Sequence, residues 1–159
     1  MPDLVIADTS CLIVLTKVGE LDILRKTYNR VIIPSAVAAE YGFAIPSWIS
    51  IETPSSEALL RFDNLGLDND EHAAIALGFE HPEAILILDD RDARRVASQL
   101  GFRLTGTIGV LIVAKELGVL SKISPVLEKI QASDFHISQA VLLEALKVAG
   151  ESTESFPQG

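Results

Sequence analysis

Residues 84–88 place five successive apolar side chains, AILIL, directly before the acidic run DDRD. An unbroken apolar strand fits a parallel strand that is covered on both faces, because a strand with one wet face alternates apolar and polar residues. Residues 4–7, 31–33 and 102–105 are further candidate strands, and helical patterns separate them. This alternation predicts the α/β class, with a central, mostly parallel sheet between two helical layers in a three-layer α/β/α sandwich.

The helical patterns can be placed from apolar spacing and from stop residues. Helices are expected over residues 9–17, 21–27, 56–65, 68–79, 92–101 and 110–117, within 124–148, and from Ser35 onward. Residues 45–54 contain two prolines and are expected to form a connection with a short extended piece. No internal repeat or linker is visible, so residues 1–150 are predicted to form a single domain and residues 151–159 a flexible C-terminal tail.

Composition narrows the class of protein. Hydrophobic residues make up 48% of the chain, but no apolar run reaches the ~18 residues that span a bilayer. No basic and apolar leader precedes the first strand, and Cys11 is the only cysteine, so a cytoplasmic protein without membrane association is expected. A net charge of −9 disfavours a protein that coats nucleic acid, yet it is compatible with acids that are balanced by divalent cations.

Acidic residues follow two of the predicted strands. Asp8 ends the first, and Asp89, Asp90 and Asp92 follow the apolar strand at 84–88. Because the carboxyl ends of parallel strands meet at one edge of a sheet, these carboxylates are expected to lie close together. An Asp before a helix can instead act as an N-cap, which contributes about 1 kcal/mol. Capping explains one or two of these acids more readily than all of them.

Two glutamates lie on predicted apolar helix faces. Glu40 is spaced three residues from both Val37 and Phe43, which puts it on the apolar stripe of its helix. Alternatively, Glu40 lies only at the edge of a narrow apolar stripe. Glu71 shares a stripe with Ala74, Ile75 and Gly78, and alternatively closes a capping box with Asp68.

A cluster of four acids would be unstable without compensation. Two unit charges about 4 Å apart repel by about 4 kcal/mol at an effective dielectric near ~20. Such a cluster must raise its pKa values or bind a cation. Oxygen ligands without companion cysteines or clustered histidines favour Mg²⁺ or Mn²⁺ over zinc.

Five segments occur in an order that resembles one known family: ADTSCLIVLTKVGELDIL, VIIPSAVAAE, LDNDEHAAIALG, ILILDDRDARRVASQLG and GTIGVLIVAKELG. In this order, over residues 5–146, the sequence resembles the PIN-domain family of metal-dependent ribonucleases. The resemblance implies a PIN-like fold and an acidic site that holds Mg²⁺ or Mn²⁺. The catalytic and metal-binding acids that it implies are Asp8, Glu40, Glu71 and Asp90. Asp89 and Asp92 are further candidate metal ligands, and Ser10 matches a small hydroxyl residue beside the first acid.

The chain departs from the family pattern at two points. Asp70 and His72 flank Glu71 where members often carry G-E-A-E, and Leu88 replaces a strand-end threonine. Basic residues expected near the acidic edge are Arg91, Arg94, Arg95, Arg103, Lys17 and Lys115. The candidate substrate-binding residues are Ser10, Arg91, Arg94 and Thr107.

The implied activity is divalent-metal-dependent endoribonuclease cleavage of RNA phosphodiester bonds, by a hydrolase that is the toxin of a toxin–antitoxin pair. An antitoxin partner and a homodimer are implied with it. The alternative is a non-catalytic PIN-like module that binds nucleic acid or protein, which the net charge of −9 favours. An aspartyl-nucleophile phosphatase would need a second acid where Ser10 stands, and no G-x-G-x-x-G follows a strand to bind a dinucleotide. The three histidines share no motif, which disfavours a metal-free ribonuclease.

Overall fold

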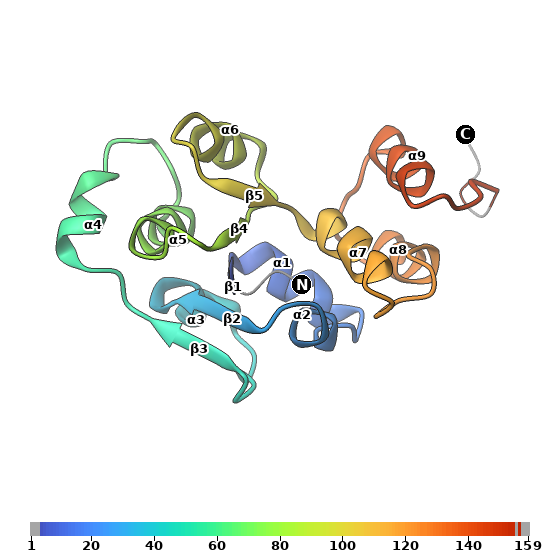
Figure 1. Cartoon of the computed structure of the whole chain (residues 1–159), viewed down its shortest axis with the longest axis horizontal. Coiled ribbons are helices and arrows are strands. Elements are labelled where there is room, and N and C mark those ends of the chain that lie inside the picture. Colours follow the sequence, from blue (N-terminus) through green and yellow to red (C-terminus); the bar gives the residue numbers. More distant parts are fainter. Residues whose placement is uncertain (1–3, 155, 157–159) are drawn as a thin grey trace.

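A computed structural model describes residues 4–154 and 156 of the chain and shows a five-stranded sheet in the order β3-β2-β1-β4-β5 (Figure 1). Every neighbouring pair of these strands is parallel. The strands are β1 (Leu4–Ala7), β2 (Arg30–Pro34), β3 (Ile49–Glu52), β4 (Ile85–Ile87) and β5 (Arg103–Thr105). The predicted α/β sandwich with a parallel central sheet is therefore confirmed.

The helices alternate with the strands along the chain. Their bounds are α1 (Thr9–Lys17), α2 (Asp22–Thr27), α3 (Ser35–Tyr41), α4 (Ser56–Arg61), α5 (Asn69–Glu80), α6 (Arg91–Gln99), α7 (Thr107–Glu116), α8 (Ser124–Ala132) and α9 (Gln139–Val148). None of the helices within the described residues combines the length and the apolar character needed to cross a bilayer.

Two hydrophobic cores lie on opposite faces of the sheet. Val5 and Ala7 of β1 point into the core that includes side chains of α1, α2, α3, α7, α8 and α9. Leu4 and Ile6, which alternate with them, point into the core made with α4, α5 and α6. All four side chains are buried, because both faces are covered by helices. The central strands are apolar throughout for this reason.

The register of the sheet brings the ends of β1 and β4 together. Ala7 pairs with Ile87, and the backbone N–H of Asp8 donates to the carbonyl of Ile87 over 3.2 Å. Asp8 and Asp89 therefore leave adjacent strands at the same edge, as the sequence predicts. Arg103 begins β5, so the expectation that it lies near this edge is wrong: a parallel strand begins at the opposite edge of the sheet.

Several helix boundaries differ from the sequence prediction; α4, for example, ends at Arg61 rather than at residue 65, and two other differences affect residues near the acidic edge. Helix α7 begins at Thr107 rather than at residue 110, so the segment GTIG starts the helix. Helix α3 ends at Tyr41, because Gly42 follows with φ +80° as a left-handed C-cap. Phe43 therefore lies beyond the helix and is 49% exposed. The predicted apolar stripe through Glu40 and Phe43 does not form, and Glu40 is exposed.

Glu151 connects the end of the chain to two helices. Its carboxylate accepts hydrogen bonds from the backbone N–H groups of Ile123 and Ser124, over 2.8 and 3.0 Å, and from Lys115 Nζ over 2.9 Å. Lys115 is thus engaged away from the acidic edge. Phe156 is also buried, while residues 155 and 157–159 of the predicted tail lie outside the described residues. The domain boundary at residue 150 stays a prediction.

Replacing Glu151 by Gln should lower the free energy of unfolding by about 1–3 kcal/mol at pH 7, because Lys115 loses its anionic partner in a site where the carboxylate is 5% exposed. Burial raises the pKa of Glu151, but the bonds from Lys115, Ile123 and Ser124 outweigh it and lower the pKa from 4.5 to about 2. Because the pKa of Glu151 is lower in the folded state, its ionised carboxylate stabilises the fold above pH 4.5. This contribution is lost as the pH falls toward 2. Urea unfolding of both proteins from pH 7 to 3 should therefore show a difference that shrinks with acid, and a constant difference contradicts the assignment.

Candidate metal centre

Asp8 is the acid at the centre of the carboxyl edge of the sheet. It follows β1, serves as the N-cap of α1, and accepts a hydrogen bond from the Cys11 N–H over 3.2 Å. Its other carboxylate oxygen lies 3.5 Å from the backbone N–H of Asp89. The residue is only 2% exposed. Capping and burial therefore coexist at Asp8.

Asp89 follows β4 and lies between Asp8 and the start of α7. Its carboxylate accepts hydrogen bonds from Thr107, over 2.8 Å from the backbone N–H and 2.5 Å from the hydroxyl. A Cβ added to Gly106 would lie 2.9 Å from Asp89 Oδ1, so glycine is what allows α7 to approach this closely. Thr107, predicted as a substrate-binding residue, is buried and orients Asp89.

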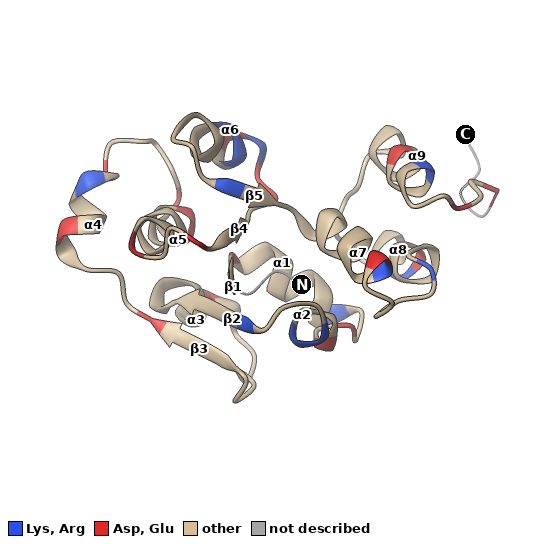
Figure 2. Ribbon diagram, viewed as in Figure 1, with Lys and Arg blue, Asp and Glu red and all other residues tan. Residues whose placement is uncertain are grey.

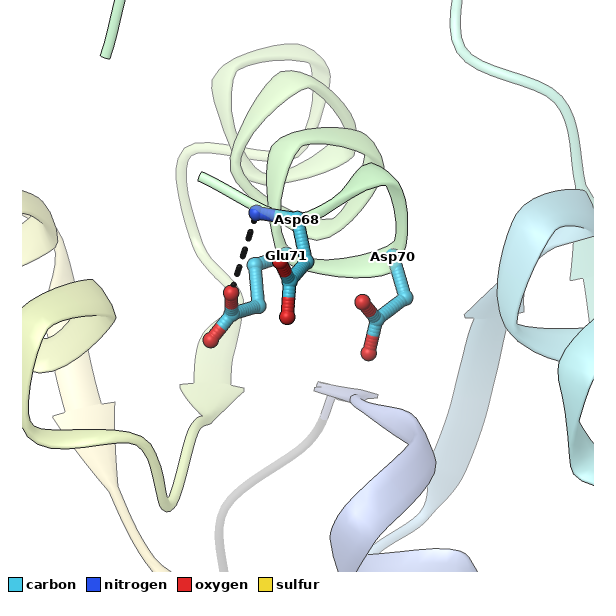
Figure 3. Close-up of side chains that lie close together, drawn as sticks. All are labelled: Asp68, Asp70 and Glu71. Atoms are coloured by element: carbon cyan, nitrogen blue, oxygen red, sulfur yellow. Dashed lines mark hydrogen bonds between the residues drawn. The ribbon is translucent and has the colours of Figure 1, made fainter. Parts of the chain in front are cut away.

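The first turn of α5 supplies a group of three acids: Asp68, Asp70 and Glu71 (Figure 3). Each offers a carboxylate oxygen within 4.8 Å of the others. Glu71 is buried and accepts a hydrogen bond from the Asp68 N–H over 3.2 Å, which completes the predicted capping box. The predicted burial of Glu71 alongside Ala74 and Ile75 is also confirmed. Figure 3 shows the Asp70 carboxylate directed toward the start of α1.

Asp90 and Asp92 differ in their surroundings. Asp90 is the N-cap of α6 and accepts a hydrogen bond from the Ala93 N–H over 2.9 Å. Its charge raises the pKa of Glu71, which places the two carboxylates within electrostatic reach of each other. Asp92 is exposed and pairs with Arg95 over 3.6 Å. Asp90 and Asp89 thus adjoin the acidic centre, and Asp92 is engaged with its own helix.

Glu40 reaches the centre from α3 through Thr9. The Thr9 hydroxyl donates to Glu40 Oε2 over 3.4 Å, and Thr9 is the residue after Asp8. Ser10, the predicted hydroxyl neighbour, is exposed in the first turn of α1. The acids of β1, α3, α5 and the β4–α6 turn thus gather around one end of the sheet (Figure 2).

The basic residues are distributed unevenly around this end. Arg91 is exposed, and Arg94 is half-buried and donates to the Leu88 carbonyl over 2.8 Å. Lys17 pairs with Asp134 over 3.1 Å and so contacts the segment between α8 and α9. Among the described residues, the arginine placed directly beside the acidic centre is Arg94 of α6.

The two buried acids titrate abnormally. Burial, the charge of Asp89 and the charge of Asp70 together raise the pKa of Asp8 from 3.8 to about 7, although the hydrogen bonds from the Cys11 and Asp89 N–H groups lower it. Burial is the largest cause that raises the pKa of Glu71 from 4.5 to about 7; the charges of Asp90, Asp70 and Asp68 act in the same direction, and the hydrogen bond from the Asp68 N–H opposes them. Among the described residues, neither acid forms an ion pair with Lys or Arg. Such carboxylates are suited to bind a divalent cation.

Asp70 was not predicted as a metal ligand from the sequence, where it stands out only as a departure from the family pattern. Its charge acts on both Asp8 and Glu71, so it lies between the two halves of the centre. The sequence signal was present, since Asp70 follows the N-cap Asp68 by two residues in the first helical turn. Only the orientation of α5 against β1 shows that this turn faces Asp8.

Comparison with known proteins identifies the family of the chain. A family model described as a PIN domain matches residues 4–151, nearly the whole chain. No curated protein and no solved structure matches the chain significantly.

Asp8→Asn should make the metal-free protein more stable at pH 8, by about 1 kcal/mol or more, since one pKa unit corresponds to about 1.4 kcal/mol. The folded pKa of Asp8, about 7, lies above its ordinary value of 3.8. The folded state therefore binds the proton more tightly, and stability falls as the pH rises from about 4 to 7. Thermal unfolding in EDTA should show a gain for Asp8→Asn at pH 8 that shrinks at pH 5.

Asp92→Asn is the matched control, because Asp92 is exposed and paired with Arg95. Its melting temperature should follow the wild-type pH dependence. If Asp8→Asn were less stable than wild type by the same amount at pH 8 and at pH 5, the claim that the buried charge of Asp8 destabilises the metal-free protein would be contradicted.

Proposed function

Since the chain belongs to the PIN-domain family, we propose that it is a divalent-metal-dependent endoribonuclease that hydrolyses RNA phosphodiester bonds. The observation that carries the proposal is the burial of Asp8 among acids that no Lys or Arg neutralises within the described residues. Helix capping alone does not require such burial, and each buried charge costs free energy unless it is paired.

The donor set fits Mg²⁺ or Mn²⁺. All candidate ligand atoms are carboxylate oxygens, and they are Asp8, Asp70, Glu71, Asp89 and Asp90, with Glu40 linked through Thr9. When bound, such an ion lowers the pKa of a water molecule and stabilises charge on the phosphate oxygens. Thr107 holds the Asp89 carboxylate in place, the capping box at the start of α5 holds Glu71, and Asp90 is held as the N-cap of α6.

The arginines of α6 support a phosphate-binding role. Arg94 is fixed by its bond to the Leu88 carbonyl and lies beside Asp89, so its guanidinium is available to a phosphate next to the metal centre. Arg91 and Ser10 are exposed nearby on the first turns of α6 and α1 and are proposed as further substrate contacts.

The biological role is proposed from the family resemblance. We place the protein in the cytoplasm as the toxin of a toxin–antitoxin pair, with an antitoxin as partner and a homodimer as its assembly. The competing function, a PIN-like binding module without turnover, is favoured by the net charge of −9. Growth arrest on expression, relieved by Asp8→Asn, distinguishes the toxin from the module.

The purified protein should cleave a mixed single-stranded RNA pool in Mn²⁺ or Mg²⁺ and should be inactive in EDTA. Asp8→Asn should reduce cleavage by at least about 100-fold, because it removes a charged ligand at the centre of the site. The rate of cleavage is measured by gel analysis of the products, and the melting temperature shows whether each variant is folded. Equal inactivity of wild type and Asp8→Asn in every metal would favour the binding module.

The acids after β4 should separate by function. Asp89→Asn and Asp90→Asn should each reduce cleavage by more than about tenfold, since their charges act on Asp8 and Glu71. Asp92→Asn, the matched control on the same turn, should retain activity because its partner is Arg95. Loss of activity in Asp92→Asn with full activity in Asp89→Asn would reverse this assignment.

A further inference from the structure

A cleft of about 580 Å³ opens beside the metal centre, between the start of α7 and the segment that joins α8 to α9. Asp89 lines the cleft, so the cleft is continuous with the acidic site. Its volume falls in the range of about 300–1,000 Å³ that is typical of small-molecule and cofactor sites. Any group held in the cleft therefore lies next to the carboxylates.

The walls of the cleft differ in chemistry. Arg94 lines the wall near Asp89 and forms no ion pair with any of the described carboxylates. Phe135 and His136, from the segment between α8 and α9, also line the cleft, and Ile108, Ile137 and Val141 add apolar surface. A cation and two aromatic residues in one cleft match the two parts of a nucleotide, its phosphate and its base.

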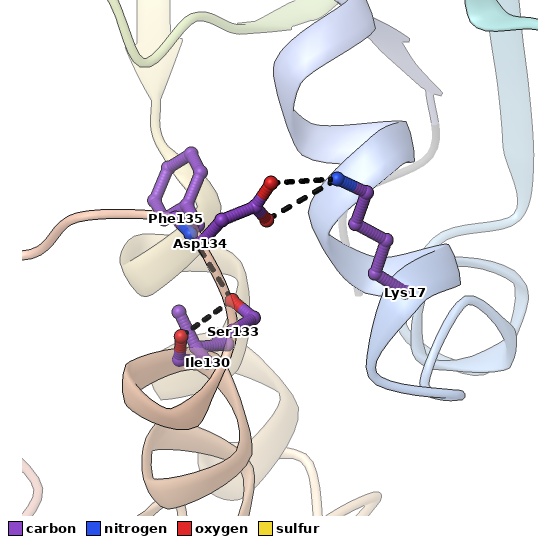
Figure 4. A network of polar contacts seen from close by, with 5 residues as sticks. All are labelled: Lys17, Ile130, Ser133, Asp134 and Phe135. Carbon is purple, nitrogen blue, oxygen red and sulfur yellow. Dashed lines mark hydrogen bonds and ion pairs between the residues drawn. The ribbon is translucent and has the colours of Figure 1, made fainter.

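Phe135 is held in a fixed position from two sides. It is half-buried and packs against the core shared by α1, α7, α8 and α9. The surrounding segment is bonded at three points (Figure 4): Lys17 to Asp134 over 3.1 Å, the Ser133 hydroxyl to the Ile130 carbonyl over 2.6 Å, and the Phe135 N–H to Ser133 Oγ over 3.2 Å. A ring fixed in this way loses little conformational freedom when a base stacks on it.

From this arrangement we propose that the cleft binds one unpaired nucleotide of the RNA substrate, with the base against Phe135 and His136 and a phosphate at Arg94. The inference rests on the proposed nuclease function and adds a base-binding subsite of this chain, formed by Phe135 and His136 in the cleft that Asp89 lines. A base paired in a duplex cannot reach the rings, because its faces are covered by its neighbours in the stack.

Binding of RNA can be measured separately from its cleavage. The full chain carrying Asp8→Asn, in Mg²⁺, is titrated against an eight-nucleotide RNA that carries fluorescein, single-stranded or annealed to its complement. The single strand should bind at least about tenfold more tightly than the duplex, and Phe135→Leu should weaken single-strand binding about five- to tenfold, in line with the loss of one stacked base. Arg94→Gln should reduce the salt dependence of binding by about one counterion.

A control variant, a second cleft variant and a base-specific fluorescence measurement make the test specific. Phe79→Leu removes an aromatic side chain that is 41% exposed at the end of α5, away from the cleft, and should bind RNA like the parent. His136→Ala alters an exposed side chain and should weaken binding without affecting folding, which covers the case in which Phe135→Leu does not fold. An RNA with 2-aminopurine at successive positions should lose fluorescence at one position on binding, and should regain it with Phe135→Leu.

The proposal is overturned if duplex and single strand bind equally, or if folded Phe135→Leu and His136→Ala proteins both bind like the parent. If the wild-type protein is inactive but still binds single strands through Phe135, the proposed nuclease function is wrong and nucleotide binding in the cleft still holds. If the protein is an active nuclease whose RNA affinity and cleavage rate do not change on substitution of Phe135 and His136, the nuclease function holds and nucleotide binding in the cleft is wrong. In that case Phe135 serves only the core or a protein partner.

Discussion

The burial of one carboxylate, that of Asp8, is the constraint on which the rest of this structure depends. Asp8 leaves β1 where the sheet is covered on both faces, so its charge is removed from water and its pKa rises to about 7. Removing an unpaired carboxylate from water is among the costlier features a fold can carry. The neighbouring acids increase that cost, and a divalent cation is the simplest way to reverse it.

The same edge shows how parallel topology creates a reactive site. Parallel strands place their carboxyl ends together, and the strand order 3-2-1-4-5 makes β1 and β4 neighbours although they are far apart in the sequence. The chain leaves these two strands in opposite layers, since α1 packs on one face and α6 on the other. A concave edge at such a topological switch point is where open α/β sheets bind their ligands. Asp8 and Asp89 lie at that point.

Surrounding contacts orient the acids. Thr107 holds Asp89, the capping box at the start of α5 holds Glu71, and Asp90 caps α6. Each acid therefore has a structural role as well as a candidate chemical one, so capping and metal binding are compatible explanations of the same residue. A carboxylate has enough lone pairs to accept a backbone N–H and still coordinate an ion. Orientation by such bonds is what keeps a metal site precise in the absence of the metal.

Local sequence patterns were sufficient to predict the class of fold and most of the acids at the carboxyl edge of the sheet. Unbroken apolar strands require cover on both faces, and acids at their ends follow from strand order alone, which is why Asp8 and Asp89 were predicted together. The roles of individual residues depended on packing between distant segments. Glu40 is exposed on the surface of α3, Arg103 lies at the far edge because β5 begins there, and Asp70 faces Asp8 because α5 packs against β1. Helix rotation and packing between distant segments depend on contacts that local patterns do not encode.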